Sequence, residues 1–321
     1  MSDWGMGGCC LPVARLPRIF FGGGVEVIPR KWRTRLWQER ITAYCFLLPD
    51  LLGLFIFVFL PIVYAFYVSL HDWDALNPMK FIGFDNYVSL SKDADWWHSV
   101  GKTLQFTVVY VPLLFCLSLG SAVMLNALRG KIVSTARTLF LIPYAITSVI
   151  SAIIGMYMLD PRNGIVNEVI KFFGGQPQQF LGSPGQALYS IVAILLWINV
   201  GYNMIIFLSA IKEIPRDYYE AATIDGASRW QIFRRITFPL LKETNTFILI
   251  VTTIGSFQVF DQIMVMTKGG PASSTEVSVV YIFKQGFQLL NMGYSSALAF
   301  VLFLLIFCLS LVQMKLFSAK D

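Results

Sequence analysis

Residues 187–211 read ALYSIVAILLWINVGYNMIIFLSAI, a run of 25 residues without one charged side chain. A helix needs about 20 apolar residues to cross the hydrocarbon core of a bilayer, so this run is long enough to span it. Reading outward in both directions gives five more runs of the same kind, at 43–70, 103–127, 138–159, 245–266 and 295–316. The sequence therefore predicts an all-α polytopic membrane protein with six transmembrane helices. The first is expected to tilt or kink, because it contains Pro49 and Pro61.

The composition of the whole chain supports this prediction. Of the 321 residues, 56% are hydrophobic and 14% are charged, whereas soluble domains carry about 25% charged residues. The net charge of +6 does not indicate a nucleic-acid partner, because the basic residues lie in short segments between the apolar runs. Such segments are typical of membrane topology, and the expected surroundings of the chain are membrane lipids.

The distribution of Lys and Arg predicts the orientation, since cytoplasmic loops of membrane proteins are enriched in both. With the N-terminus inside, 18 of these residues lie in cytoplasmic segments and 7 in outer segments (cytoplasmic 1–42, 128–137, 212–244 and Lys315 onward; outer 71–102, 160–186 and 267–294). Both termini are therefore expected in the cytoplasm. The expected organisation is a cytoplasmic extension at 1–40, with a short helix at about 30–40, and a transmembrane domain at 41–321.

Motifs of catalysis and metal binding are missing from the sequence. It has no GxxxxGK[ST], HExxH or GxSxG motif and no Cys/His cluster, so we expect no catalytic residue, metal or cofactor in this chain. His71 and His98 are expected at the surface near the outer side. The acidic residues Asp50 and Asp261 are expected near the two membrane interfaces. An ion-coupled transporter usually needs charged groups at mid-depth, so this pattern argues against that class.

The longest segment expected in the cytoplasm, 212–244, has the pattern of a helix, a tight turn and a second helix. Pro215 suits the start of the first helix, and Gly226 can take the positive φ that ends it. Ser228 and Gln231 have the spacing of a capping box for the second helix, which Pro239 ends. We call residues 213–243 the elbow and expect three exposed aromatic side chains on it, Tyr218, Tyr219 and Trp230. These features fit a docking knob for a soluble partner and an interfacial helix equally well.

Eight positions in the elbow have the identities and spacing of a known motif: Glu220, Ala221, Ala222, Asp225, Gly226, Ala227, Ile236 and Pro239. On these residues the elbow resembles the EAA loop of binding-protein-dependent ABC importer permeases. Family members often carry a second proline shortly after Pro239, where this chain has Glu243. Segments 59–61, 81–87, 137–143 and 269–271 are similar to the carbohydrate branch of the family, and the resemblance covers about residues 40–317.

The resemblance implies a type I ABC importer permease in a bacterial inner membrane. Such a subunit would translocate an oligosaccharide, glycoside or polyol delivered by an extracytoplasmic solute-binding protein. Two separate ATPase subunits would bind ATP and Mg²⁺, and a second, different permease would complete a heterodimer. Residues 220–222 and 225–227 would form a coupling helix seated in an ATPase cleft, where Glu220 would meet a basic residue.

A sugar pathway is expected to combine aromatic faces with amide and hydroxyl groups. Two of the runs offer such groups, Trp197, Asn199, Tyr202 and Asn203 in one and Thr252, Ser256 and Gln258 in the other. Resemblance to the maltose permease places Asn199, Tyr202, Thr252 and Ser256 near sugar-contacting positions. The same residue types also form hydrogen bonds between packed helices, and that alternative stays open.

The sequence leaves three alternatives to a sugar importer permease. The importer could carry a non-sugar solute, such as a glycerol phosphate, polyamine, phosphate or amino acid, because the EAA loop is common to those systems. An ion-coupled secondary transporter and an integral-membrane enzyme are disfavoured by the missing mid-membrane charges and catalytic motifs.

Overall fold

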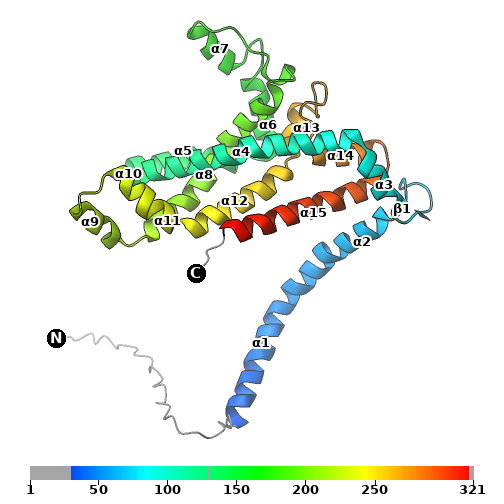
Figure 1. The fold of residues 1–321 in the computed structure, drawn as a ribbon, viewed down its shortest axis with the longest axis horizontal. Coiled ribbons are helices and arrows are strands. Elements are labelled where there is room, and N and C mark those ends of the chain that lie inside the picture. Colours follow the sequence, from blue (N-terminus) through cyan, green and yellow to red (C-terminus); the bar gives the residue numbers. More distant parts are fainter. Residues whose placement is uncertain (1–29, 129, 318–321) are drawn as a thin grey trace, which may run out of the picture. The chain divides into compact units, whose positions relative to one another are not determined.

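The protein is described by a computed structural model that covers residues 30–128 and 130–317 (Figure 1). By internal contacts the chain divides into two units, residues 1–60 and 61–321. Residues 1–29 of the predicted N-terminal extension lie outside the described residues.

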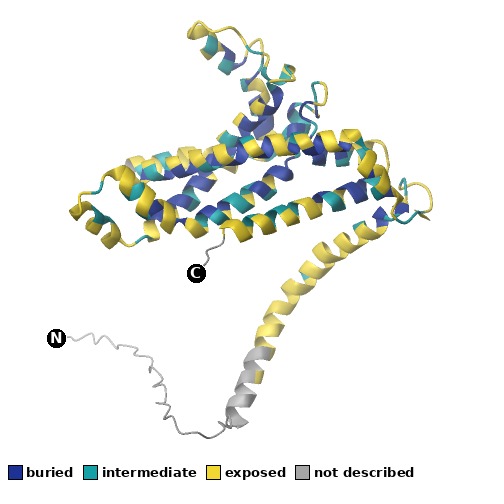
Figure 2. Ribbon diagram, viewed as in Figure 1, coloured by how far each residue is buried: buried dark blue, intermediate teal, exposed yellow. Residues whose placement is uncertain are grey.

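The first unit consists of helix α1 (Arg30–Leu54) and the π-helical turn η1 (Phe55–Phe59). The predicted short helix at 30–40 is not a separate element, because α1 continues without a break to Leu54. Pro49 lies inside α1. In η1 the N–H of Leu60 donates to the carbonyl of Phe55, five residues earlier. Every described residue from 41 to 60 except Gly53 is exposed (Figure 2), which suits a membrane-spanning helix that lipid or another subunit covers.

The second unit is helical apart from one two-residue β-pair, in which His71 pairs with Phe81 and Asp72 with Lys80. Its elements, in chain order, are α2 (Leu60–Ser69), β1 (His71–Asp72), β2 (Lys80–Phe81), α3 (Asp85–Lys92), α4 (Ala94–Ala127), α5 (Lys131–Ala145), α6 (Ser148–Met158), α7 (Ile165–Phe172), η2 (Phe180–Gly182), α8 (Ala187–Glu213), α9 (Arg216–Ile224), α10 (Arg229–Ile232), η3 (Phe233–Thr237), α11 (Phe238–Leu240), α12 (Lys242–Phe257), α13 (Asp261–Met266), α14 (Ser278–Phe283), η4 (Lys284–Gln288) and α15 (Met292–Phe317).

Helix α8 is the centre of this unit. It packs along α4 and is flanked by α5 and α12, and α15 lies beside α12. Fully buried side chains such as Phe106, Ile191 and Phe207 fill the space between these helices. The crossing of α5 and α8 is very close at Gly201, where a Cβ atom would lie 1.8 Å from the carbonyl oxygen of Phe140. Small residues at such a crossing allow two membrane helices to approach.

The predicted spans are present, but two of them are broken. Five helical segments of the described chain are long and apolar enough to cross a membrane, and the third predicted span, 138–159, is two helices. Helices α5 and α6 meet at a bend of 100°, where the backbone of Ile146 and Thr147 is extended. The fifth span is interrupted at residues 258–260, between α12 and α13.

The carboxylate of Asp93 makes four hydrogen bonds at the N-terminus of α4. Asp93 caps α4 by accepting from the N–H groups of Asp95 (3.0 Å) and Trp96 (3.2 Å). Its other oxygen accepts from the hydroxyls of Tyr281 (2.7 Å) and Tyr294 (2.5 Å). Partial burial alone would raise the pKa of Asp93, but these four hydrogen bonds outweigh burial and lower it.

The two histidines differ from each other in their surroundings. His98 is exposed, as predicted. His71 is not at the surface: it is 5% exposed, and its Nδ1 lies 2.8 Å from the carbonyl oxygen of Tyr67. The prediction for His71 was wrong because β1 folds back against the start of α15, where the backbone of Gly293 lies beside that of His71.

Candidate functional site

The elbow has the helix–turn–helix geometry that its sequence predicts. Pro215 is the N-cap of α9, which ends at Ile224. Gly226 takes a φ of +76°, and the N–H groups of Gly226 and Ala227 donate back to the carbonyls of Thr223 (3.1 Å) and Ala222 (2.9 Å). These bonds satisfy carbonyls that would otherwise be left free at the helix end. The chain therefore reverses within three residues.

The second helical segment of the elbow runs from α10 through η3 to α11. Ser228 and Gln231 form the predicted capping box, with bonds of 2.7 Å from the Ser228 N–H and 3.3 Å from the Gln231 N–H. The hydroxyl of Tyr219 lies 3.3 Å from that of Thr237, which fixes α9 against this segment. Pro239 lies inside α11, and Leu241 marks the break before α12.

The outer surface of the elbow carries apolar side chains that nothing in the described chain covers. Tyr218 is 53% exposed, Trp230 67% and Ile224 86%. Tyr219 was also predicted to be exposed, but it is half-buried because it packs toward Thr237. The carboxylate of Glu220 lies on the same surface and is exposed. Asp217 and Asp225 are exposed as well. Acidic groups among large apolar side chains form a surface to which another protein can dock.

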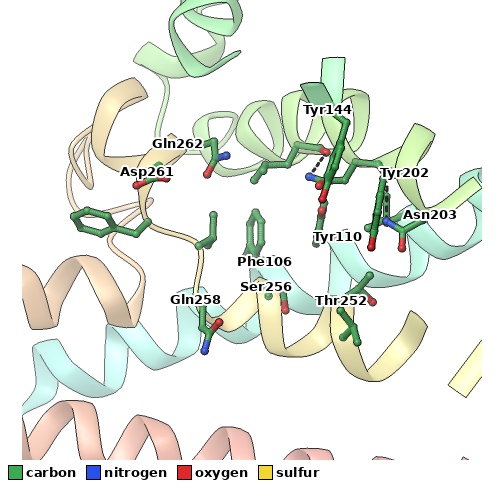
Figure 3. A pocket seen from close by; sticks show the side chains of 17 residues that line it. Phe106, Tyr110, Tyr144, Tyr202, Asn203, Thr252, Ser256, Gln258, Asp261 and Gln262 are labelled. Carbon is green, nitrogen blue, oxygen red and sulfur yellow. Dashed lines mark hydrogen bonds between the residues drawn. The ribbon is translucent and has the colours of Figure 1, made fainter. Parts of the chain in front are cut away.

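A second candidate site is a cavity of about 380 Å³ between α4, α5, α8 and the broken fifth span (Figure 3). Six of the seven predicted pathway residues line it: Asn199, Tyr202, Asn203, Thr252, Ser256 and Gln258. The seventh, Trp197, lines a different, apolar cavity with Leu139 and Pro143. Successive residues of a helix are rotated by about 100°, so Trp197 and Tyr202 point about 140° apart. One helix cannot aim both into the same cavity.

The polar groups of this cavity are not equally free to meet a ligand. Ser256 is 1% exposed, and its hydroxyl donates to the carbonyl of Thr253 (2.7 Å) and shares a bond of 2.9 Å with Thr107. Thr252 donates to the carbonyl of Ile248 at 2.6 Å. The Ser256 hydroxyl therefore joins α12 to α4, as the alternative interpretation of the sequence allowed, whereas the Thr252 hydroxyl bonds within its own helix. Gln258 is exposed.

Aromatic rings form one end of the cavity. Tyr144 and Tyr202 are stacked, with ring centroids 4.5 Å apart and planes at 11°, and each is more than 40% exposed. Tyr110 stacks on Phe106 at 5.2 Å. Figure 3 shows the tyrosines gathered at one end and Gln258, Asp261 and Gln262 at the other. Flat rings beside amide and carboxylate groups are suited to binding a molecule with both C–H faces and hydroxyls.

Sequence reasoning missed eleven of the 17 lining residues, among them Phe106, Tyr110, Tyr144, Asp261 and Gln262. Asp261 was expected to be an ordinary interfacial residue, but it faces the cavity and accepts a bond of 2.6 Å from the hydroxyl of Ser148. Ser148 begins α6 and Asp261 begins α13, so this bond joins the two span breaks. Pro143 precedes the first break, but Pro49 and Pro112 lie inside continuous helices, so a proline alone does not identify it.

Charge in the cavity is confined to one carboxylate. Among the 17 residues that line it there is no Lys, Arg or His, and Asp261 is the one carboxylic acid. The remaining polar groups are amides and hydroxyls, which bind neutral hydrogen-bonding molecules without desolvating a second charge.

Comparison with known proteins gives consistent results along most of the chain. The family described as "Binding-protein-dependent transport system inner membrane component" matches residues 115–318. The trehalose/maltose transport system permease protein MalF of Thermococcus litoralis is 34% identical over 281 residues, which cover 87% of this chain and 94% of that protein.

Two solved structures have the same fold. A bacterial ABC transporter involved in the import of the acidic polysaccharide alginate aligns with a TM-score of 0.77 at 25% identity, over 88% of this chain and 98% of the matched chain. A bacterial alginate ABC transporter in complex with an alginate pentasaccharide-bound periplasmic protein aligns with a TM-score of 0.78 at 24% identity, over 88% and 97%.

Proposed function

The chain belongs to the family of binding-protein-dependent transport system inner membrane components, and we propose that its elbow couples sugar movement through the cavity to ATP hydrolysis on separate subunits. It has the type I ABC importer permease fold and is a sugar-transporting permease subunit.

The geometry of the elbow carries the coupling proposal. Its turn is fixed by the positive φ of Gly226 and its two helices are joined through Tyr219 and Thr237. A force applied to its exposed face at Ile224 and Trp230 is therefore passed on rather than absorbed by local bending. The elbow connects directly to α8 and α12, both of which line the cavity. Movement of the elbow would shift two walls of the cavity together.

The remaining parts of the machine follow from this role. The chain is a non-catalytic subunit, and two ATPase subunits bind the ATP and Mg²⁺. A second, different permease completes the membrane pathway as a heterodimer, and an extracytoplasmic solute-binding protein delivers the sugar. The excess of Lys and Arg in the segments that include the elbow favours the cytoplasmic location of both termini.

The cargo that the cavity favours is an uncharged, hydroxyl-rich sugar or polyol. An anion in this cavity would meet Asp261 without a compensating cation among the lining residues. Two like charges about 5 Å apart at an effective dielectric constant of about 20 repel each other by about 3 kcal/mol. Glycerol phosphates and uronates are therefore disfavoured relative to neutral saccharides. The stacked Tyr144–Tyr202 pair is the surface for the sugar's C–H face.

The test of the coupling proposal is a charge reversal at Glu220 in the assembled, reconstituted importer. Glu220→Lys should reduce ATPase stimulation by the loaded binding protein by about tenfold or more, because a charged hydrogen bond at a docking surface is worth about 1.5–3 kcal/mol. Glu168→Lys makes the same change at another exposed acid, on α7, and should leave stimulation unchanged. Normal stimulation in the Glu220 variant would contradict the proposal.

A further inference from the structure

Helix α7 carries an apolar stripe that nothing in the described chain covers. Ile165, Val169 and Phe172 recur at helical spacing on one face, and Phe173 follows directly. Their exposed fractions are 66%, 50%, 85% and 81%. Figure 1 shows α7 standing away from the bundle of α4, α8 and α12. Four large apolar side chains side by side on a projecting helix mark a contact surface rather than a solvated one.

The orientation of this stripe is fixed by the opposite face of α7. Asn167 is fully buried. Its amide nitrogen donates to three carbonyls, including that of Gln178 at 3.0 Å, and its oxygen accepts from the N–H of Gln178 at 2.9 Å. The turn before the helix is equally constrained, since a Cβ on Gly164 would lie 2.5 Å from the carbonyl oxygen of Asp160. The stripe therefore cannot rotate inward to bury itself.

The segment that leads into α7 is also apolar and exposed. Helices α5 and α6 together have the length and composition of one broken membrane span, and Ile150, Ile153 and Tyr157 of α6 are 52%, 40% and 76% exposed. Only six residues separate α6 from α7. The apolar surface of the span thus continues onto the stripe, with a tyrosine between them, and tyrosine is enriched where hydrocarbon meets the headgroups.

The charges of the segment also suit a lipid surface better than a charged protein partner. Residues 160–186 contain two acidic and two basic side chains and are neutral overall. The two charges on α7 itself, Glu168 and Lys171, pair with each other at 2.8 Å. Neither charge is thus left to steer a partner, and the free energy of contact comes from apolar area.

We propose that α7 is an interfacial membrane anchor, with Ile165, Val169, Phe172 and Phe173 inserted among the acyl chains of the leaflet at which α6 ends. Under the orientation proposed above this is the outer leaflet. The occupant of the stripe is lipid, and neither the solute-binding protein nor the second permease covers it. The anchor holds the outer end of the broken third span at a fixed depth, beside the cavity that its neighbour α5 lines.

The experiment uses the complete importer in vesicles of phosphatidylcholine. The five native cysteines are replaced, and a single cysteine at Phe173→Cys carries an environment-sensitive fluorophore. Lys171→Cys, two residues away on the polar face, is the matched control. Quenching is measured with nitroxides on the lipid acyl chains and with aqueous iodide. Phe172→Cys provides a second probe of the stripe, and assembly is checked by co-purification.

We expect acyl-chain nitroxides to quench the Phe173 probe about threefold more than the Lys171 probe, with the opposite order for iodide. Adding phosphatidylglycerol or salt should change neither result, because the contact is apolar. Equal iodide quenching of both probes without lipid quenching would overturn the proposal. Shielding of the Phe172 and Phe173 probes only after the binding protein is added would overturn it in favour of a protein partner. Neither outcome depends on ATPase coupling, so this proposal can fail while the function stands.

Discussion

The positive φ of Gly226 makes a quantitative prediction about the elbow. At φ +76° there is open space around the glycine, because a Cβ placed there meets no atom within 4 Å. An alanine would therefore cost backbone strain alone, about 1–2 kcal/mol for an L-residue in the left-handed region. If the elbow docks only in this conformation, Gly226→Ala should weaken its association with the ATPase subunit by about 5- to 30-fold.

The assay is titration of the purified permease pair with its ATPase subunit, followed by transport in vesicles. Gly226→Asn should weaken association less than alanine does, since asparagine tolerates this region better. The matched control is Gly185→Ala, at an exposed glycine that also has open space but does not have a positive φ. Its association should equal that of the unmodified protein.

Two results would refute the reasoning. If Gly226→Ala associates as well as Gly185→Ala, the turn is not held in the left-handed conformation when the elbow docks. If asparagine weakens association more than alanine, the size of the side chain matters and the backbone strain does not.

Three further predictions concern the rest of the chain. Asp93→Asn should lower the free energy of unfolding of the complex at pH 7 by about 2 kcal/mol, because the charged hydrogen bonds from Tyr281 and Tyr294 are lost while asparagine still caps α4. Because the folded pKa of Asp93 is lowered, its stabilisation is fully present above its unfolded pKa, about 3.9, and is lost as the pH falls from there through the folded pKa. The difference from the unmodified protein should therefore vanish in acid; a pH-independent difference would contradict this. Gly201→Ala should prevent assembly, as judged by co-purification, because its Cβ would clash at 1.8 Å with a backbone carbonyl; normal yield would contradict the close crossing. Tyr202→Ala should reduce sugar uptake about tenfold while assembly is unchanged, whereas Trp197→Ala, equally exposed on the same helix, should not; equal effects would remove Tyr202 from the pathway.

Much of the architecture could be predicted from local chemistry. Runs of about 20 apolar residues mark the spans. Each span must be a helix, because a backbone without hydrogen-bond partners cannot cross a bilayer. The elbow followed from Pro215, Gly226 and the Ser228–Gln231 box, each of which acts on neighbouring backbone atoms. These local interactions do not depend on tertiary packing, so they can be recognised from the sequence alone.

The broken spans could not be predicted in the same way. Pro49 and Pro112 remain inside helices α1 and α4, whereas the chain bends by 100° shortly after Pro143. The difference lies in tertiary contacts, since α6 packs on α13 and Ser148 donates to Asp261 across 113 residues. No local pattern encodes that pairing.

The pathway residues show a second limit. Trp197 and Tyr202 lie in the same apolar run and were predicted to share one pathway. On a helix, however, residues five positions apart point in directions that differ by about 140°. Tyr144 was missed because its stacking partner lies on another helix. Ser256 was expected to offer its hydroxyl to a sugar, but that hydroxyl is hydrogen-bonded to Thr107. A substitution such as Ser256→Leu would therefore test helix packing rather than sugar transport.

The central claim is that force from a nucleotide-hydrolysing subunit enters the membrane domain through the turn between α8 and α12. The most direct measurement places a single cysteine at Ala221 of the assembled importer, in a chain without its native cysteines, and probes it in sealed, right-side-out vesicles. We predict that an impermeant maleimide added outside does not react with it, and that a bifunctional reagent joins it to the ATPase subunit and stops uptake. Reaction from outside, or cross-linking that leaves uptake intact, would contradict the account.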